Sequence, residues 1–274
     1  MPELPEVETV RLSLIDLVKG RTIKSADVIY GRIIQDISID EFKKRLENER
    51  INDILRYGKY LFFKLDHYTL ISHLRMEGKY FYKEEEIELT KHDHIVFHLD
   101  NNYKLVYNDT RKFGVMYLIN ETDYDKVCKC PPINKLGIEA NSLNLTKEYL
   151  FDKFSKKTGP IKSELLDQEI ICGLGNIYAD EVLFLSKLHP LKKANTLTIN
   201  DCELIANASR DVMAKAISLG GTTIKSFMSS HEISGLFQNE LNVHTKDKCK
   251  ICDSDIIKIR VGGRGTYYCP ICQK

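Results

Sequence analysis

The chain has 274 residues, of which 43% are hydrophobic and 29% charged, as expected of a globular protein with one or two domains. No apolar run approaches the roughly 18 residues of a membrane span, and Glu3, Glu6 and Glu8 stand where a signal peptide would become hydrophobic. We therefore expect a cytoplasmic protein with no membrane partner. The net charge of +1 excludes a strongly basic protein that binds polyanions by bulk charge alone.

The first predicted element is a helix from Pro5 to Gly20. Proline is favoured at the first position of a helix, and glycine ends one. Between them, apolar residues recur at a spacing of three and four. Glu3 and Glu6 then lie at the helix N-terminus, where the helix dipole stabilises negative charge.

A second interpretation of this segment is chemical, and it starts at Pro2. Methionine is commonly removed before a small residue, which would expose the secondary amine of Pro2. An α-amine titrates at about 7.7–8.0, so part of it is neutral and nucleophilic at neutral pH. It could form an iminium with an aldehyde-like carbon, while the neighbouring carboxylates move protons. The residues alone leave both interpretations of Glu3 and Glu6 open.

Residues 21–120 are predicted to be mainly strands. YLFFKL (60–65) and TLISHL (69–74) lie on either side of Asp66-His67, and HIVFHL (94–99) and YKLVY (103–107) lie on either side of Asn101-Asn102. Both patterns are typical of hairpins. Short strands at this spacing indicate a β-sandwich, which we assign to an N-terminal domain over 1–130.

A linker is predicted over 131–146, and helical periodicity follows it. Helices are expected in KEYLFDKF (147–154), SELLDQEII (163–171), NIYADEVLFLSKL (176–188) and roughly over 200–219. The segment CGLGN (172–176) separates two of them, which is typical of a helix–turn–helix motif. We assign a helical domain to 147–238, and the fold class is α+β.

The last predicted element is a zinc ribbon over 239–274. Its ligands are two Cys-x-x-Cys pairs separated by sixteen residues: Cys249, Cys252, Cys269 and Cys272. Four thiolates complete a tetrahedral site with no open position, so one structural Zn²⁺ is expected. The segment from His244 onward contains seven Lys and Arg but only three Asp, a local excess of positive charge of 7 − 3 = +4. A helix–turn–helix motif with a zinc ribbon makes nucleic acid the leading partner.

Several motifs together resemble the formamidopyrimidine-DNA glycosylase family, bacterial repair enzymes that remove oxidised purines such as 8-oxoguanine. In chain order they are PELPEVETV, LRYGKY (55–60), HLRMEGKY (73–80), KHDH (91–94), DTRKFG (109–114), GLGNIYADE (173–181) and GGRGTYYC (262–269). The resemblance spans the whole chain. It implies a helix–two-turn–helix motif in the helical domain and a monomer that acts on double-stranded DNA containing an oxidised purine or an abasic site.

The resemblance also implies roles in catalysis. Pro2 would attack C1′ of the damaged nucleotide and form a Schiff base, and Glu3 would transfer protons during sugar ring opening. Glu6 would help to hold the extruded base. Lys59 matches the family's catalytic lysine, which contacts a phosphate beside the lesion, and Arg264 matches an arginine that grips a phosphate. β- and δ-elimination would then cut both phosphodiesters.

Further residues are implied to contact DNA. Met76, Arg111 and Phe113 would fill the space that the extruded nucleotide leaves, and Arg111 would contact the orphaned cytosine. Residue types such as Met76 and Phe113 are otherwise more often found in a core.

Phosphate contacts are implied for His92 and for Asn176, which begins a predicted helix. Lys157 and Lys162, in the basic segment SKKTGPIK (155–162), are predicted to bind phosphate as well.

One departure from the family pattern is Val243-His244-Thr245, where many relatives have a tyrosine. Two alternative functions stay open at this point. One is a zinc-ribbon nucleic-acid-binding protein without catalysis, and the other is a homologue limited to abasic-site cleavage.

Overall fold

A computed structural model describes residues 2–222 and 235–274, so Met1 and the loop residues 223–234 lie outside the described residues. The described chain divides into two compact units, one of residues 2–134 and one of residues 135–222 with 235–274. Among the described residues, no helix has the length and apolar character needed to cross a membrane.

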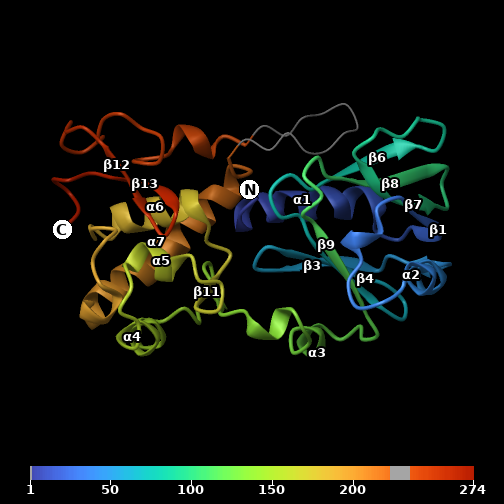
Figure 1. The fold of residues 1–274 in the computed structure, drawn as a ribbon, viewed down its shortest axis with the longest axis horizontal. Coiled ribbons are helices and arrows are strands. Elements are labelled where there is room, and N and C mark those ends of the chain that lie inside the picture. Colours follow the sequence, from blue (N-terminus) through green and yellow to red (C-terminus); the bar gives the residue numbers. More distant parts are fainter. Residues whose placement is uncertain (1, 223–234) are drawn as a thin grey trace. The chain divides into compact units, whose positions relative to one another are not determined.

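The N-terminal unit is a β-sandwich, as predicted (Figure 1). One antiparallel sheet has the order β2 (Glu49–Arg50), β1 (Thr22–Val28), β7 (Asp93–Leu99), β8 (Tyr103–Asn108) and β6 (Lys79–Glu84). The other has the order β3 (Asp53–Tyr57), β4 (Tyr60–Lys64), β5 (Thr69–His73) and β9 (Val115–Ile119). Both predicted hairpins are present, as β4 with β5 and as β7 with β8.

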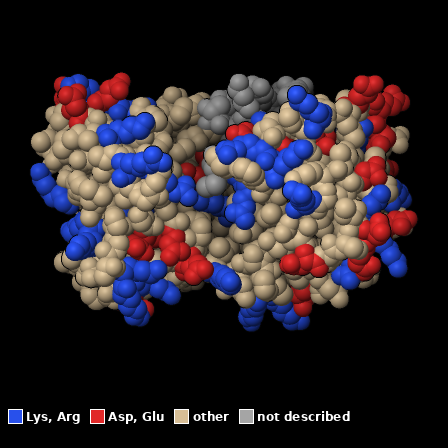
Figure 2. All heavy atoms as spheres, viewed as in Figure 1, with Lys and Arg blue, Asp and Glu red and all other residues tan. Residues whose placement is uncertain are grey.

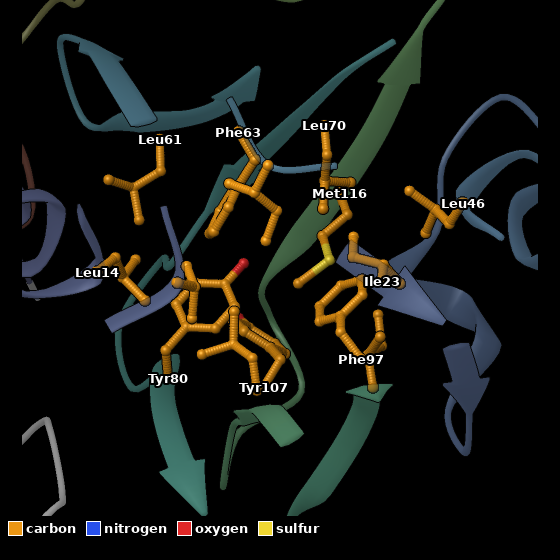
Figure 3. Packing of buried hydrophobic residues seen from close by; sticks show 14 of the residues in the cluster. Leu14, Ile23, Leu46, Leu61, Phe63, Leu70, Tyr80, Phe97, Tyr107 and Met116 are labelled. Carbon is orange, nitrogen blue, oxygen red and sulfur yellow. The ribbon is translucent and has the colours of Figure 1, made fainter. Parts of the chain in front are cut away.

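The core of this unit lies between the two sheets. Figure 3 shows side chains from both sheets pointing toward one another, among them Leu61, Phe63, Leu70, Tyr80, Phe97 and Tyr107. Burial of these apolar side chains is the main favourable contribution to folding. One polar contact lies within the core, where the Tyr80 hydroxyl donates to Ser72 Oγ at 2.7 Å.

Two helices accompany the sandwich. Helix α1 (Leu4–Val18) matches the predicted first helix, and it packs against β3 and β4. Helix α2 (Ile39–Leu46) interrupts the region that the sequence indicated to be mainly strands. Its signal was Ser38, whose hydroxyl accepts a hydrogen bond from the Glu41 N–H as an N-cap. A 3₁₀ turn, η1 (Gly31–Ile33), precedes it.

The region predicted as a linker, 131–146, contains short regular elements. Helix α3 (Tyr124–Val127) ends just before it, and η2 (Ile133–Lys135) and β10 (Ile138–Glu139) lie within it. Strand β10 pairs in parallel with β11 (Ile171–Cys172). The domain boundaries at 130, 146 and 238 stay predictions.

The C-terminal unit contains four helices among its described residues: α4 (Lys147–Ser155), α5 (Ile161–Leu165), α6 (Asn176–Leu185) and α7 (Ile199–Ser218). The predicted helix over 163–171 is wrong beyond Leu165. The β-branched Ile170 and Ile171 are buried, and Ile171 joins the two-stranded sheet instead. Gln168 braces the connection to α6, because its side chain accepts from the Gly173 N–H and donates to the Leu174 carbonyl.

The C-terminal hairpin pairs β12 (Ile257–Val261) with β13 (Arg264–Tyr268). Gly262 and Gly263 form its two-residue turn with φ of 55° and 79°. Positive φ at both positions is the requirement of the tight hairpin turn that matches strand twist, which explains the glycine pair. Short 3₁₀ turns, η3 (Ala194–Thr196) and η4 (Phe237–Asn239), complete the described elements.

Candidate functional site

The N-terminus of α1 places the two acidic residues beside Pro2. Glu3 and Glu6 are 2% and 3% exposed, so both carboxyl groups are buried. The Glu3 N–H donates to Glu6 Oε2 at 2.8 Å, which closes the first turn of α1 as an N-terminal cap. Glu6 therefore holds the residue that directly follows Pro2. The helix-capping and the chemical interpretation of Glu3 and Glu6 are therefore compatible, because the cap fixes the backbone directly after Pro2, the candidate nucleophile.

Lys59 lies in the two-residue turn between β3 and β4, where Tyr57 pairs with Tyr60. It is 5% exposed, and its ammonium lies close enough to His73 for its charge to act on that imidazole. Lysine side chains usually lie at the surface, so a buried lysine at the tip of a hairpin is unusual. This burial argues against the interpretation of Lys59 as an ordinary surface lysine.

His73, at the end of β5, is a site residue that the sequence did not single out. Burial, with the nearby charges of Arg75 and Lys59, lowers the pKa of His73 to about 3. Its Nδ1 accepts a hydrogen bond from the Arg75 N–H at 2.9 Å, which leaves the proton of the neutral ring on Nε2. The imidazole is thus an uncharged hydrogen-bond donor beside Lys59.

The three residues predicted to fill the space of an extruded nucleotide come together in the structure. Arg111 Nη1 lies 3.0 Å from Met76 Sδ, and the Arg111 guanidinium lies 4.7 Å from the centre of the Phe113 ring. Met76 and Phe113 are 40% and 51% exposed, which is unusual for large apolar side chains and argues against the core interpretation. We call these three side chains the exposed triad.

A buried carboxylate that the sequence did not single out organises the triad. Asp109 is fully buried and accepts hydrogen bonds from the backbone N–H groups of Arg111, Phe113 and Gly114, at 2.8 to 3.0 Å. A Cβ at Gly114 would lie 1.6 Å from the Tyr107 hydroxyl oxygen, so only glycine allows this loop to lie so close to the core.

The KHDH segment has two different histidines. His94 is buried, and its Nε2 lies 2.8 Å from the Asp109 carbonyl oxygen, so it supports the loop that carries the triad. His92 is half-buried beside that loop, and its own carbonyl accepts from the Asp109 N–H. The phosphate contact of His92 stays a prediction, in a position that has partial access to solvent.

In the C-terminal unit, the first residue of α6 is linked to the start of β13 in the C-terminal hairpin. Asn176 Nδ2 donates to the Gly265 carbonyl at 2.9 Å, next to the exposed Arg264. Gly262 in the turn of the same hairpin lies close to Ser163 of α5. The structure thus brings Asn176 and Arg264, 88 residues apart in the chain, to one place.

The predicted phosphate contact of Lys162 is wrong for this conformation. Its side chain is fully buried, and its ammonium donates to Asp180 Oδ1 at 2.6 Å and to the Asn176 carbonyl at 2.8 Å. A buried charge requires such a partner, so Lys162 holds α5 against α6. Asp180 also pairs with His244 Nδ1 at 2.6 Å.

Lys157 is partly exposed and lies 3.3 Å from Asp167 and 3.8 Å from Glu164. The Asp167 hydrogen bond raises the pKa of Lys157. A phosphate would have to compete with these two carboxylates for its ammonium. The contact of Lys157 with DNA stays a prediction.

The four predicted zinc ligands form one cluster. Their sulfur atoms all lie within 4.8 Å of one another, and three of the distances are 3.5 Å (Cys252 to Cys269), 3.6 Å (Cys252 to Cys272) and 3.9 Å (Cys249 to Cys272). Four ligands at about 2.3 Å from a tetrahedral Zn²⁺ would be about 3.8 Å apart, so the residues fit the metal.

The environment acts differently on the thiols of this cluster: burial, with hydrogen bonds to neighbouring sulfurs, raises the pKa of Cys272 to about 12, whereas Cys269 is shifted toward thiolate. Burial alone would raise the pKa of Cys269, but hydrogen bonds from the Ser254 hydroxyl and from backbone N–H groups outweigh it and lower the pKa to about 6. Ligation requires the thiolate. The cluster of four cysteines thus forms a structural zinc site.

Comparisons with known proteins agree with this arrangement along the whole chain. Residues 1–116 match the formamidopyrimidine-DNA glycosylase N-terminal domain, residues 136–228 match the H2TH domain of the same enzymes, and residues 246–274 match the zinc finger found in FPG and IleRS.

Individual relatives are similar over their full length. The chain is 46% identical to the formamidopyrimidine-DNA glycosylase of Exiguobacterium sibiricum, over 100% of this chain and 99% of the relative. It is 42% identical to that of Bacillus subtilis, with the same coverage.

Solved structures of the Lactococcus lactis Fpg are similar as well. One is a complex with DNA containing N7-benzyl-Fapy-dG, with a TM-score of 0.91, 41% identity and 100% of both chains covered. Another is a complex with abasic-site DNA, with a TM-score of 0.90, 41% identity and 99% of both chains covered. The family, the α+β fold with its sandwich, H2TH motif and ribbon, and the zinc site are therefore as the sequence predicted, and the chain belongs to the formamidopyrimidine-DNA glycosylase family, the DNA glycosylases of base excision repair.

Proposed function

We propose that this protein excises oxidised purines from double-stranded DNA and then cleaves the strand at the abasic site, with the amine of Pro2 as nucleophile. The observation that carries the proposal is the N-terminus of α1, where Pro2 stands directly before a buried Glu3 whose N–H is held by Glu6. Membership of the family supports the reaction class. The burial of Glu3 and Glu6 next to Pro2 supports the proposed roles of these residues.

The chemistry follows from a secondary amine beside buried carboxylates. The neutral amine of Pro2 attacks C1′, a new N–C1′ bond forms, and the bond from C1′ to the damaged base breaks. Opening of the sugar ring, with proton transfer by Glu3, gives an iminium. The iminium withdraws electrons, so the phosphodiesters on its 3′ and then its 5′ side leave by β- and δ-elimination.

The remaining site residues bind and position DNA in this proposal. The exposed triad enters the base stack when the damaged nucleotide is extruded, and Glu6 helps to hold the extruded base. Lys59, His92, Asn176 and Arg264 contact phosphates, and Arg264 can do so with two parallel hydrogen bonds. Figure 2 shows Lys and Arg side chains where Figure 1 labels α1, whereas acidic side chains gather at the β6 end, where Glu84, Glu86 and Glu88 are exposed.

The test compares two duplexes in the presence of borohydride, which reduces a Schiff base to a stable adduct. One contains 8-oxoguanine opposite cytosine and the other an abasic site. Adducts on both support the proposal. An adduct on abasic DNA alone would indicate an enzyme limited to strand cleavage, and binding without any adduct would indicate a nucleic-acid-binding protein.

We also propose that the protein acts as a monomer in the bacterial cytoplasm. Its DNA-contacting residues are all assigned to one chain. Light scattering of the protein with and without a short abasic duplex tests this, and a mass of two chains per duplex would contradict it.

A further inference from the structure

A half-buried ion-pair network joins α1 to the hairpin turn that carries Lys59. Glu8 lies in α1, two residues beyond Glu6, and its carboxylate accepts from Arg56 Nε at 2.9 Å and from Arg11 Nη2 at 2.6 Å. The side chains of Glu8 and Arg56 are 15% and 8% exposed. Burial raises the pKa of Glu8, but the hydrogen bonds from Arg11 and Arg56 outweigh this and lower it, so Glu8 is ionised.

Arg56 connects this carboxylate to the turn itself. The same guanidinium that donates Nε to Glu8 donates Nη1 to the Gly58 carbonyl at 2.9 Å. Gly58 directly precedes Lys59. The Arg56 carbonyl is held in turn by the Tyr124 hydroxyl at 3.1 Å. The two donors belong to one planar guanidinium, and their acceptors lie on α1 and in the turn. Arg56 therefore sets the position of the turn relative to the helix.

The register of α1 against β3 indicates where the turn lies along the helix. Lys19 pairs with Asp53, Arg11 Nη1 donates to the Ile54 carbonyl, and Glu8 pairs with Arg56, so the helix and the strand run in opposite directions. Along this register the strand approaches the N-terminus of α1, and the turn with Gly58 and Lys59 follows it directly.

From this register we infer that Glu8 and Arg56 are positioning residues, which hold Lys59 beside the N-terminal amine of Pro2 through the Gly58 carbonyl. The inference rests on the proposed function, because it concerns the step in which Pro2 and Lys59 act on the same nucleotide. Catalysis between preorganised groups is sensitive to small displacements, and a shift of about 1 Å can lower a rate about 100-fold.

The test measures single-turnover cleavage of 8-oxoguanine duplex and, separately, affinity for a duplex with a non-cleavable abasic analogue. Glu8→Gln keeps the shape but removes the charge, and Arg56→Lys keeps the charge but cannot donate to Glu8 and Gly58 together. Each should lower the rate about tenfold or more while the affinity changes by less than about threefold. The matched control is Lys19→Gln, which breaks the exposed ion pair between the same two elements and should leave the rate within about twofold.

A second comparison separates positioning from general stability. In a Lys59→Ala background, Glu8→Gln should lower the residual rate by no more than about twofold, since its effect passes through Lys59. A loss as large as in the wild-type background would overturn the inference, and so would an unchanged rate in both single variants. If either variant does not fold, as judged by thermal melting, the other decides. If the wild-type protein itself cleaves nothing, the proposed function fails; if it cleaves and the variants match it, the inference alone fails.

Discussion

Single residues in the proposed site depend on burial for their charge state. His73 accepts a backbone hydrogen bond at Nδ1 and lies beside the charges of Arg75 and Lys59, so its protonation inside the folded protein is unfavourable. A neutral imidazole can donate from Nε2 without adding a further positive charge beside Lys59. Glu8 shows the opposite balance, since hydrogen bonds from Arg11 and Arg56 outweigh the effect of burial and lower its pKa.

The charge state of His73 predicts how stability depends on pH. The unfolded chain binds a proton at this residue below its usual pKa of 6.5, whereas the folded chain does so only near about 3. The unfolded state therefore binds more protons in this window, and stability falls as the pH is lowered through it, by up to about 1.4 kcal/mol per pH unit. Urea unfolding from neutral pH to about pH 4.5 should show a shallower loss for His73→Asn than for the wild type. Equal slopes would show that His73 is protonated in the folded protein.

A second residue whose change is predictable is Arg264, the first residue of β13, next to the turn of the C-terminal hairpin. Arg264→Ala should weaken DNA binding and make its salt dependence shallower by about one unit of slope, because one phosphate contact is lost. The fold should persist, since the side chain is exposed and is not a zinc ligand. Lys258→Ala, on the facing strand, is the control. A slope equal to that of the wild type would contradict a phosphate contact.

At the scale of elements, the loop between β8 and β9 depends on one carboxylate. Asp109 accepts three backbone hydrogen bonds without exposure to water, so Asp109→Ala would leave three N–H groups without their acceptor. Each buried unsatisfied group costs about 1–3 kcal/mol, so the loop should rearrange and the exposed triad with it.

Base excision from intact duplex should then fall more than cleavage of abasic DNA, because only the former requires the triad to replace a stacked base. Parallel rate measurements on the two substrates check this. Asp123→Ala, which removes the carboxylate that caps α3 in the same unit, should leave the ratio of the two rates unchanged. Equal losses on both substrates in Asp109→Ala would instead indicate a general packing defect.

The elements also show what the sequence could and could not predict. The strands of the two hairpins and the first helix were predictable, because short apolar runs beside turn residues and helical periodicity are local signals. The end of α5 at Leu165 was not, since the pairing of Ile171 with Ile138 depends on a partner 33 residues away. Lys162 was misassigned for the same reason: a basic segment indicates solvent, whereas Asp180 on another helix decides its environment. Asp109 had a local signal in the Asp-Thr start of a loop, but its three acceptor roles are a tertiary feature.

At the scale of the whole molecule, the zinc site links metal binding to the structure of the C-terminal unit. Cys249 and Cys269 are buried together with Phe184 of α6 and Val243. Loss of the metal would therefore affect the packing against α6 as well as the hairpin that carries Arg264.

Cys249→Ser should reduce bound zinc from one ion per chain to nearly none and abolish DNA binding. Metal analysis, hydrogen exchange of the hairpin and a binding assay check the three parts. Cys202→Ser is the control, because this buried thiol lies in α7 and outside the cluster. Wild-type protein that contains no zinc, or a variant that binds DNA normally, would contradict the account.

The proposal for the whole molecule depends most directly on Pro2. Anything that acylates or extends its nitrogen, such as retained Met1 or an N-terminal tag, converts the amine into an amide whose lone pair is delocalised into the carbonyl. Such a protein should bind damaged DNA but neither excise the base nor cleave the strand. Pro2→Gly keeps an amine without the ring and should retain partial activity, whereas Glu3→Gln should slow proton transfer and leave the amine available.

The decisive measurement is borohydride trapping on 8-oxoguanine duplex, followed by proteolysis and mass spectrometry of the peptide that carries the DNA. We predict a single adduct on the N-terminal nitrogen of Pro2 in protein that has lost Met1. An adduct on Lys59, or on any other lysine, would contradict the mechanism.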